Sequence, residues 1–329
     1  MTDTKVDTLM AQTRRPGVLA AHSLDEFVFS VPDLAVAKNF YTQFGLNVVE
    51  EAVNGSPYLS IYAVNNPHRY FRVTQSDKKR LQWLTFGIYA DDLPAFEKHL
   101  SAMGVPKVSS PDPLNPGGLW VQASDGFAVH VKVAAKSSPS APPPRSFPPA
   151  SNGFGRAPST SSVKKVYPLY MSHMLMFTKD FDKAVDFFCK GMGLRVSDSS
   201  GGNIIAFMHS PHGSDHHMLA MLQSDDYGFH HCSWTVDSMD QVGFGMKQMA
   251  QAGFAYGWGV GRHVLGSNYF RYVRDPWGSY AEYSFDIDFV PSTVDWPSKD
   301  HPPEDSLYVW GPDVPEGFGT NFETQAFVQ

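Results

Sequence analysis

Cysteine, long apolar runs and excess positive charge are all scarce in this sequence. Its 329 residues include only Cys189 and Cys232, too few for a framework of disulfides, and residues 1–20 contain no apolar stretch typical of a secretory signal. Gly, Pro, Asp or His interrupts every candidate run of about 18 apolar residues, and the net charge is −7. We therefore expect a cytoplasmic protein that binds neither a membrane nor nucleic acid and has a small molecule as its partner.

Length and composition allow two globular domains, each with its own core. Hydrophobic residues make up 42% of the chain and aromatic residues 14%, and 329 residues exceed the usual size of one domain. Residues 134–166 are rich in Pro, Ser and Gly and offer little to bury, which is typical of a linker. The predicted division is an N-terminal extension (1–21), a first domain (22–133), the linker (134–166), a second domain (167–290) and a C-terminal tail (291–329).

The two halves repeat one pattern of strand, helix and strand. Both FVFSVPDLAVAKNFYTQFGLNVV (27–49) and MLMFTKDFDKAVDFFCKGMGLRV (174–196) run from an apolar strand through an Asp and a helical stretch to a Gly-Leu exit. The pattern recurs more faintly at 84–105 and 232–254. We predict an α+β fold of four βαβββ modules, paired into two half-open barrel domains that each surround a cavity. Two unrelated α+β domains are the alternative.

Histidine is concentrated in the second half, where eight of the thirteen histidines lie between residues 173 and 263. The segments around them resemble the type I extradiol ring-cleaving dioxygenases of the vicinal-oxygen-chelate superfamily, which include biphenyl-2,3-diol, catechol 2,3- and trihydroxytoluene dioxygenases. In the most specific segment His263, Tyr272 and Glu282 stand nine and ten residues apart, as in that family. The matching segments are SHMLMFT (172–178), DHHMLA (215–220), FHHCSWTVDSMDQVGF (229–244) and GRHVLGSNYFRYVRDPWGSYAEY (261–283).

The resemblance implies a mononuclear non-haem iron(II) site held by His173, His231 and Glu282, with manganese(II) as the less favoured ion. Two imidazoles and one carboxylate leave one face of an octahedral ion open for a diol and O2. The implied reaction is extradiol cleavage, in which O2 opens a substituted catechol ring next to its two hydroxyl groups. Equivalent module positions lead us to expect His173 and His231 to face each other across the cavity. A slip of one residue would replace His231 by His230.

The resemblance assigns three further residues to the reaction. His217 in DHHMLA is implied as the acid–base residue near the O2 position. His216 is the alternative if the register shifts by one residue, although we expect its side chain to point away from the metal. His263 and Tyr272 are implied to hydrogen-bond the substrate oxygens, and Tyr272 to help deprotonate the catechol.

Other residues receive structural interpretations. His209 and His212 flank a proline and are assigned to solvent, Cys232 is interpreted as a packed thiol, and GWGVG at 257–261 is predicted to be a turn because no strand-to-helix order surrounds it. The side chains available to shape an apolar cavity are Met174, Met176, Phe177, Met208, Trp234, Phe254, Trp258 and Tyr280.

In the first half, Glu26 and His130 align with His173 and Glu282, so that carboxylate and imidazole are exchanged. Because a credible third ligand is lacking, we interpret this domain as structural and expect it to hold no metal.

Two other functions are compatible with the predicted fold. A lyase or isomerase of the glyoxalase kind uses its metal as a Lewis acid and does not need the pair His263 and Tyr272. A ligand-sequestering protein of the same fold lacks the three metal ligands, so a stoichiometric iron assay distinguishes it. We further expect the chain to form a homo-oligomer.

Overall fold

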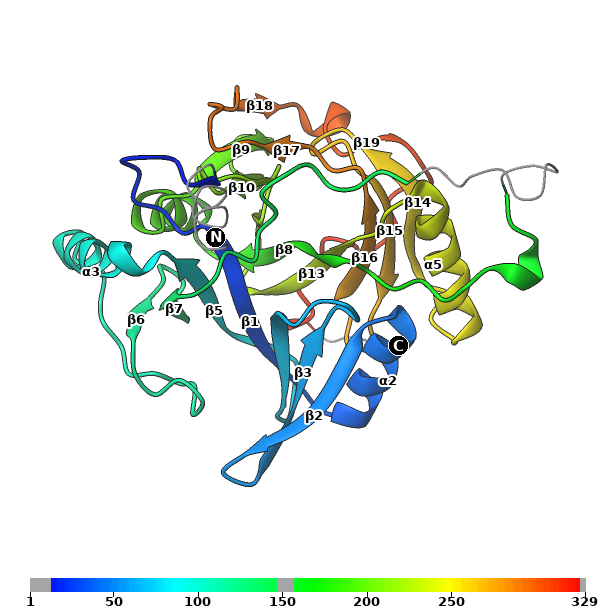
Figure 1. The fold of residues 1–329 in the computed structure, drawn as a ribbon, viewed down its shortest axis with the longest axis horizontal. Helices are drawn as coiled ribbons and strands as arrows, with labels where there is room; N and C mark the ends of the chain where they lie inside the picture. Colours follow the sequence, from blue (N-terminus) through cyan, green and yellow to red (C-terminus); the bar gives the residue numbers. More distant parts are fainter. Residues whose placement is uncertain (1–12, 147–156, 326–329) are drawn as a thin grey trace, which may run out of the picture.

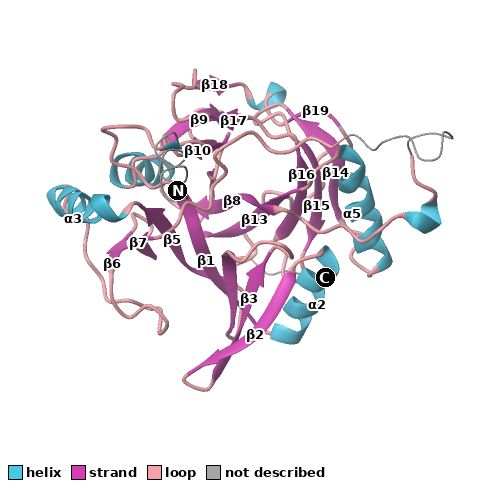
Figure 2. Cartoon of the chain, viewed as in Figure 1, coloured by secondary structure: helices cyan, strands magenta, loops and turns pink. Residues whose placement is uncertain are grey.

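Two large β-sheets adjoin each other at the centre of the molecule (Figure 1), and the helices lie at its periphery (Figure 2). The computed structural model describes residues 13–146 and 157–325. The fold is mixed α+β, as the sequence predicted. Within these two ranges no helix is both long and apolar enough to cross a membrane.

The first sheet combines two modules. The first contains β1 (Ser23–Val31), α2 (Leu34–Phe44), β2 (Asn47–Val53), β3 (Ser56–Tyr62) and β4 (Arg69–Gln75). The second contains β5 (Arg80–Ile88), η1 (Ala90–Asp92), α3 (Leu93–Ala102), β6 (Leu119–Gln122) and β7 (Ala128–Val133). The strand order is β2-β3-β4-β1-β5-β7-β6, with β1 and β5 antiparallel at the junction. One predicted strand is replaced by a single bridge between Lys107 and Val121. Pro106 precedes this bridge and has no amide N–H to donate.

The second sheet repeats the arrangement. Its modules consist of β8 (Tyr170–Thr178), α4 (Phe181–Asp186), η3 (Phe187–Gly191), β9 (Arg195–Ser200), β10 (Ile205–His209) and β12 (Leu219–Gln223), followed by β13 (Gly228–Thr235), α5 (Met239–Gln251), β14 (Gly257–His263), β15 (Tyr269–Arg274) and β16 (Tyr280–Phe285). The C-terminal segment adds β18 (Lys299–His301), η4 (Pro303–Asp305) and β19 (Tyr308–Trp310). The order is β18-β9-β10-β12-β8-β13-β16-β15-β14-β19, so the predicted tail supplies both outer strands. Short elements complete the described chain: η2 (Thr160–Ser162), and β11 (Ser214–Asp215) paired with β17 (Phe289–Val290).

The hydrophobic core crosses from one sheet to the other, whereas we expected a separate core in each half. The ring of Phe229 lies 5.1 Å from that of Phe27 and 5.0 Å from that of Phe29. The ring of Phe44 in α2 stacks on Tyr283 in β16 at 3.9 Å, and the Tyr283 hydroxyl donates to the Phe44 carbonyl at 2.7 Å. Each such aromatic pair contributes about 1 kcal/mol beyond its buried area. The first half therefore helps to fix β16.

A few contacts hold the described parts of the predicted linker against the rest of the protein. The Ser23 hydroxyl accepts the amide N–H groups of Ser137 and Ser138 at 2.8 and 2.9 Å, and Val166 is buried. Residues 147–156 of the linker lie outside the described residues. The domain boundary at this segment stays a prediction.

In the first sheet an ion-pair network includes Glu26, one of the residues aligned with the predicted metal site. The Arg72 guanidinium donates to Glu26 Oε1 at 2.7 Å and to Asp112 Oδ2 at 2.6 Å. All three residues are at most 3% exposed. His130 instead stacks its ring on Trp120 at 4.2 Å. The Glu26 carboxylate is therefore already neutralised by a guanidinium and is not directed at an open cation position.

The variant Arg72→Met is expected to lower the free energy of unfolding by about 3–5 kcal/mol, because it leaves the carboxylate of Asp112 buried without a cation and Glu26 with Arg69 as its remaining cationic partner. Urea unfolding measures the effect. The matched control is Arg145→Met, which removes a pair to Asp286 whose arginine side chain is 62% exposed, and it should cost less than about 1 kcal/mol. An equal decrease in the free energy of unfolding in the two variants would contradict a stabilising role of the buried network.

Candidate metal centre and cavity

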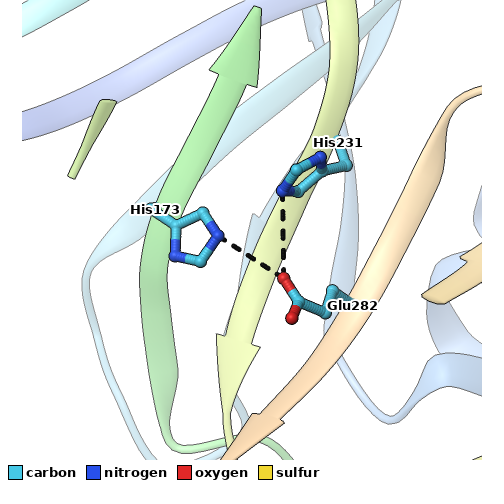
Figure 3. A group of neighbouring side chains, drawn as sticks. All are labelled: His173, His231 and Glu282. Carbon is cyan, nitrogen blue, oxygen red and sulfur yellow. Dashed lines mark ion pairs between the residues drawn. The ribbon is translucent and has the colours of Figure 1, made fainter. Parts of the chain in front are cut away.

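Three neighbouring strands of the second sheet bring His173, His231 and Glu282 together. Glu282 Oε2 lies 3.4 Å from His173 Nε2 and 3.8 Å from His231 Nε2 (Figure 3). The ligand atoms lie within 4.8 Å of one another, and no other group of this kind occurs among the described residues. All three side chains are buried. The arrangement could hold one metal ion.

Strand pairing explains why these side chains converge. Ser233 of β13 is opposite His173 of β8 on one side and opposite Glu282 of β16 on the other. His231 lies two residues before Ser233 and therefore points to the same face of the sheet. The expectation that His173 and His231 face each other across the cavity is wrong. They lie on adjacent antiparallel strands, because the two modules share a continuous sheet.

A β-bulge changes the choice between His230 and His231. The register of β13 against β8 shifts between Phe229 and His231, so both histidines line the same cavity. Strand alternation therefore does not distinguish them, but their partners do. His230 Nε2 lies 2.6 Å from the carbonyl oxygen of Phe318. A carbonyl only accepts, so this nitrogen carries a hydrogen and has no lone pair for a metal.

The hydrogen bonds of His230 also determine the tautomer of His231. With hydrogen at Nε2, a neutral His230 has a bare Nδ1 and accepts from His231 Nδ1 at 2.6 Å. His231 Nε2 is then unprotonated and faces Glu282. Burial, reinforced by the neighbouring imidazoles, lowers the pKa of His231 well below its ordinary value. The ring is therefore neutral at pH 7, which is the form that binds metals.

A second chain of hydrogen bonds orients His173 in the same sense. The Ser172 hydroxyl donates to Asp215 Oδ2 at 2.6 Å and lies 3.3 Å from His173 Nδ1. Because the hydroxyl hydrogen is directed to Asp215, the serine oxygen accepts the N–H of His173. The other nitrogen, Nε2, is left bare and faces Glu282.

Two atoms of this group lack any hydrogen-bond partner. They are His231 Nε2 and Glu282 Oε2. Lone pairs of buried atoms that face one another repel unless a cation lies between them, so the donor set fits a metal ion. The other carboxylate oxygen of Glu282 accepts the amide of Asn268 at 3.0 Å, which fixes the orientation of the carboxylate. Asn268 was not predicted, although it stands between His263 and Tyr272 in the most specific matching segment.

Tyr272 and His263 form a second hydrogen-bonded unit beside the carboxylate. His263 Nδ1 donates to the carbonyl of Leu307 at 2.7 Å, so its Nε2 accepts the Tyr272 hydroxyl at 2.9 Å. Burial, and then the charge of Glu282, raise the pKa of Tyr272 well above its ordinary value. Burial also lowers the pKa of His263, although Glu282 opposes this shift. Both side chains are neutral at pH 7 and line the cavity.

His217 lines the cavity, and His216 does not. The His217 ring lies 4.0 Å from the ring of His173. Burial and the neighbouring imidazoles lower the pKa of His217 well below its ordinary value. His216 points away from the metal group, as expected, but its Nδ1 is 3.0 Å from His217 Nδ1 and its Nε2 is 2.9 Å from Asp198. The two residues lie between β11 and β12 rather than in a strand.

The cavity has a volume of about 290 Å³. Of the eight side chains that the sequence made available to shape a cavity, Trp258 lines this one and the other seven do not. Met174 and Met176 alternate to the opposite face of β8 and enter the core. Residues from the predicted tail also line the cavity, among them Leu307 and Phe318, which were not predicted to lie there. The full lining is His173, Leu175, Ser200, Ile204, Ile205, Phe207, His217, Leu222, His230, His231, Trp258, His263, Leu265, Asn268, Tyr272, Pro303, Ser306, Leu307, Val314, Phe318 and Gly319.

Two other expectations are wrong. His209 and His212, assigned to solvent, are buried because the N-terminal segment covers their loop, and His212 Nδ1 accepts the amide of Arg15 at 3.0 Å. The predicted turn at 257–261 is the first part of β14. A Cβ at Gly257 would lie 1.9 Å from the carbonyl oxygen of Tyr272, so this glycine permits close approach of two strands.

Known proteins resemble this chain over the second half and over nearly its whole length. Residues 170–283 match the family described as the Glyoxalase/Bleomycin resistance protein/Dioxygenase superfamily. Metapyrocatechase 2 from Cupriavidus necator is 44% identical over 304 residues, which cover 92% of this chain and 93% of that protein.

Solved structures share the fold at lower identity. The Mn(II)-bound glyoxalase from Novosphingobium aromaticivorans has a TM-score of 0.69 at 23% identity, covering 93% of this chain and 99% of that one. Homoprotocatechuate 2,3-dioxygenase from Arthrobacter globiformis has a TM-score of 0.70 at 16% identity, covering 94% and 92%. At these identities the likeness concerns the fold alone.

Proposed function

The chain belongs to the Glyoxalase/Bleomycin resistance protein/Dioxygenase superfamily, and from this premise we propose that it is an extradiol dioxygenase that opens a catechol-type aromatic diol with O2. The observation that carries the proposal is the convergence of three buried donors, with bare His231 Nε2 and Glu282 Oε2 left without partners. The 44% identity to metapyrocatechase 2 supports the same reaction class.

The residues that would hold the metal are His173, His231 and Glu282. Iron(II) on two imidazoles and one carboxylate supplies open positions for a diol and for O2 and relays electrons between them. The protein supplies the orientation. Ser172 and His230 hold the two ligand imidazoles by their Nδ1 atoms, and Asn268 holds the carboxylate. Groups that support metal ligands in this way typically change affinity or activity by about 10–100-fold when they are lost.

The other polar side chains of the cavity bind the diol and move its protons. We assign Tyr272 and His263 to the substrate oxygens, because they form one hydrogen-bonded pair beside Glu282. His217 exchanges a proton with the substrate through Nε2, the nitrogen that is not engaged by His216. Its low pKa makes it neutral before the diol is bound. The apolar wall and the covering C-terminal segment exclude water from these transfers.

The lining of the cavity favours a substrate with an uncharged, apolar substituent. Leu175, Ile204, Ile205, Leu222 and Phe318 all face it, and among the described residues no Lys, Arg, Asp or Glu lines it. A carboxylate on the ring would be buried without a cationic partner, at a cost of about 3 kcal/mol or more.

A panel of catechols tests both parts of the proposal. Iron-loaded enzyme should consume O2 and form a yellow ring-opened product from alkyl- and aryl-substituted catechols. Carboxylate-bearing catechols should show kcat/KM values lower by roughly 100-fold or more, because the carboxylate loses its hydration without gaining a partner. Preference for the carboxylated catechols would overturn the substrate class only. Turnover of a hemithioacetal without O2 consumption would favour a glyoxalase-like reaction and overturn the proposed function.

A further inference from the structure

Two pairs of adjacent histidines at the cavity share the same hydrogen-bond arrangement. The chains of hydrogen bonds finish at different acceptor groups. In each pair a ring that lines the cavity contacts its neighbour through Nδ1, at 2.6 Å for His231 and His230 and at 3.0 Å for His217 and His216. The first chain ends on a neutral carbonyl, that of Phe318. The second ends on the carboxylate of Asp198, which is 6% exposed. A carbonyl is enough to orient an imidazole ring, so the buried carboxylate behind His216 indicates a role beyond orientation.

The donors around Asp198 show that its carboxylate is ionised. His216 Nε2 and His301 Nε2 each lie 2.9 Å from it, Trp296 Nε1 donates to it at 3.2 Å, and the backbone N–H of Lys299 donates at 3.1 Å. Burial opposes ionisation, but the hydrogen bonds from His216, His301 and Trp296 outweigh it and lower the pKa of Asp198 to about 2. An ionised carboxylate only accepts, so His216 carries hydrogen at Nε2.

The donors and acceptors of this chain determine which ring nitrogen of His217 carries hydrogen. His216 donates from Nε2 to Asp198, and where its Nδ1 carries no hydrogen the 3.0 Å contact requires His217 Nδ1 to donate to it. We propose that Asp198 and His216 are positioning residues that keep the hydrogen of His217 on Nδ1 and so present a bare Nε2 to the substrate. His217 is therefore set to act first as a base. The catalytic consequence rests on the proposed function, whereas the hydrogen-bond arrangement does not.

The same chain accounts for a later role as an acid. When Nε2 of His217 takes a proton from a diol hydroxyl, the hydrogen on Nδ1 passes to Nδ1 of His216. His217 is then neutral again, with hydrogen at Nε2 ready to be donated, and the diol keeps the negative charge. The positive charge lies on His216 beside the carboxylate of Asp198. Return of both hydrogens restores the first state. This transfer explains the difference between the two anchors, because only a carboxylate stabilises a cation at His216.

Four groups surround Asp198 and His216. His301 of β18 contacts Asp198 Oδ1 and has a side chain that is 28% exposed. His209 is the other imidazole near His216, bonded through Nδ1 to Ser197 Oγ at 2.7 Å and kept neutral by burial, which lowers its pKa to about 4. The ring of Trp296 covers His216 at 5.2 Å. His216 itself is fully buried, whereas His301 on the other oxygen of the same carboxylate is partly exposed.

Nitrogen NMR of the metal-free protein tests the tautomer directly. The His217 signals are those that disappear in His217→Phe. In the wild-type protein we expect hydrogen at Nδ1 and a bare Nε2. In Asp198→Asn the amide can donate to His216 Nε2, which moves hydrogen to His216 Nδ1 and then to His217 Nε2. The matched control is Asp300→Asn in the neighbouring strand, whose carboxylate accepts from Ser199 Oγ at 2.7 Å and does not contact His216. It should leave the His217 signals unchanged.

Hydrogen at Nε2 in the wild-type protein would overturn the proposal without any variant, so the test does not depend on folding of Asp198→Asn. An unchanged tautomer in Asp198→Asn, or the same change in Asp300→Asn, would overturn it as well.

Steady-state kinetics of the iron-loaded enzyme tests the consequence. Asp198→Asn should retain iron and the KM for a catechol while kcat falls by roughly 10–100-fold. Asp300→Asn should retain kcat. A rise in KM at unchanged kcat would show that Asp198 only shapes the cavity, and would overturn its role in proton transfer. If the wild-type enzyme opens no catechol, the proposed function fails, and the NMR experiment still decides the tautomer.

Discussion

Glu282→Ala is expected to weaken iron(II) binding by roughly 10²–10³-fold or more, and His173→Ala and His231→Ala should do the same. Each variant removes one of three converging donors, and metal affinity is built from such ligand contributions. Iron content after anaerobic loading and desalting measures the effect. Ring-opening activity should fall with the iron content, because the substrate and the oxidant meet only at the metal in this account.

The matched control for the histidine variants is His209→Ala. His209 is 2% exposed and His173 3%, and both lie in the second sheet, but His209 does not line the cavity. It should keep one iron per chain. Unchanged iron content in any two of the three ligand variants would contradict the assignment of the metal site. Full activity with manganese(II) in place of iron would change the identity of the ion and leave the ligands as they are.

His217→Phe is expected to lower turnover by roughly 10²–10⁴-fold, the usual contribution of a positioned acid–base residue. Phenylalanine fills the same space beside His173 but has no nitrogen to exchange a proton. Iron content and catechol affinity should be retained, since His217 is not among the converging donors. Rapid-mixing measurements separate catechol binding from turnover. Loss of iron in this variant would place His217 among the ligands and contradict the choice of His173, His231 and Glu282.

Local patterns in the sequence predicted the modules because they depend on neighbouring residues. Asp33 accepts the backbone amides of Ala35 and Val36 at the start of α2, and Gly45 ends this helix at a φ of 101°. Asp180 has the corresponding place before α4 and accepts the amide of Lys183. Such signals recur at matching intervals, so the repeat could be identified without any knowledge of strand pairing.

Contacts between distant segments could not be predicted in this way. The core shared by Phe44 and Tyr283 joins residues far apart in the chain. The bulge at His230 depends on how β13 pairs with β8. The tail from Pro291 carries no strong strand pattern, yet β18 and β19 pair with the outer strands of the second sheet because those strands offer unpaired backbone groups.

The residues of the site differ in the same way, because some were predicted from local patterns and others depend on contacts in the folded chain. His173, His231 and Glu282 were predicted because they stand at equivalent places in the modules and within segments that resemble a known family. Asn268 and Asp198 were not, since an amide or a carboxylate that orients another side chain has no spacing of its own. Their roles follow only from the atoms that they contact in the folded chain.

The most direct test of the central claim is mass spectrometry of the product formed from an alkylcatechol by the iron-loaded enzyme under ¹⁸O₂. We expect a ring opened next to the diol, with both oxygen atoms of one ¹⁸O₂ molecule incorporated, apart from exchange with water at any aldehyde. The same product should be absent when Glu282→Ala is used. Cleavage between the two hydroxyl-bearing carbons, incorporation of a single oxygen atom, or equal product from Glu282→Ala would contradict extradiol cleavage at the site formed by His173, His231 and Glu282.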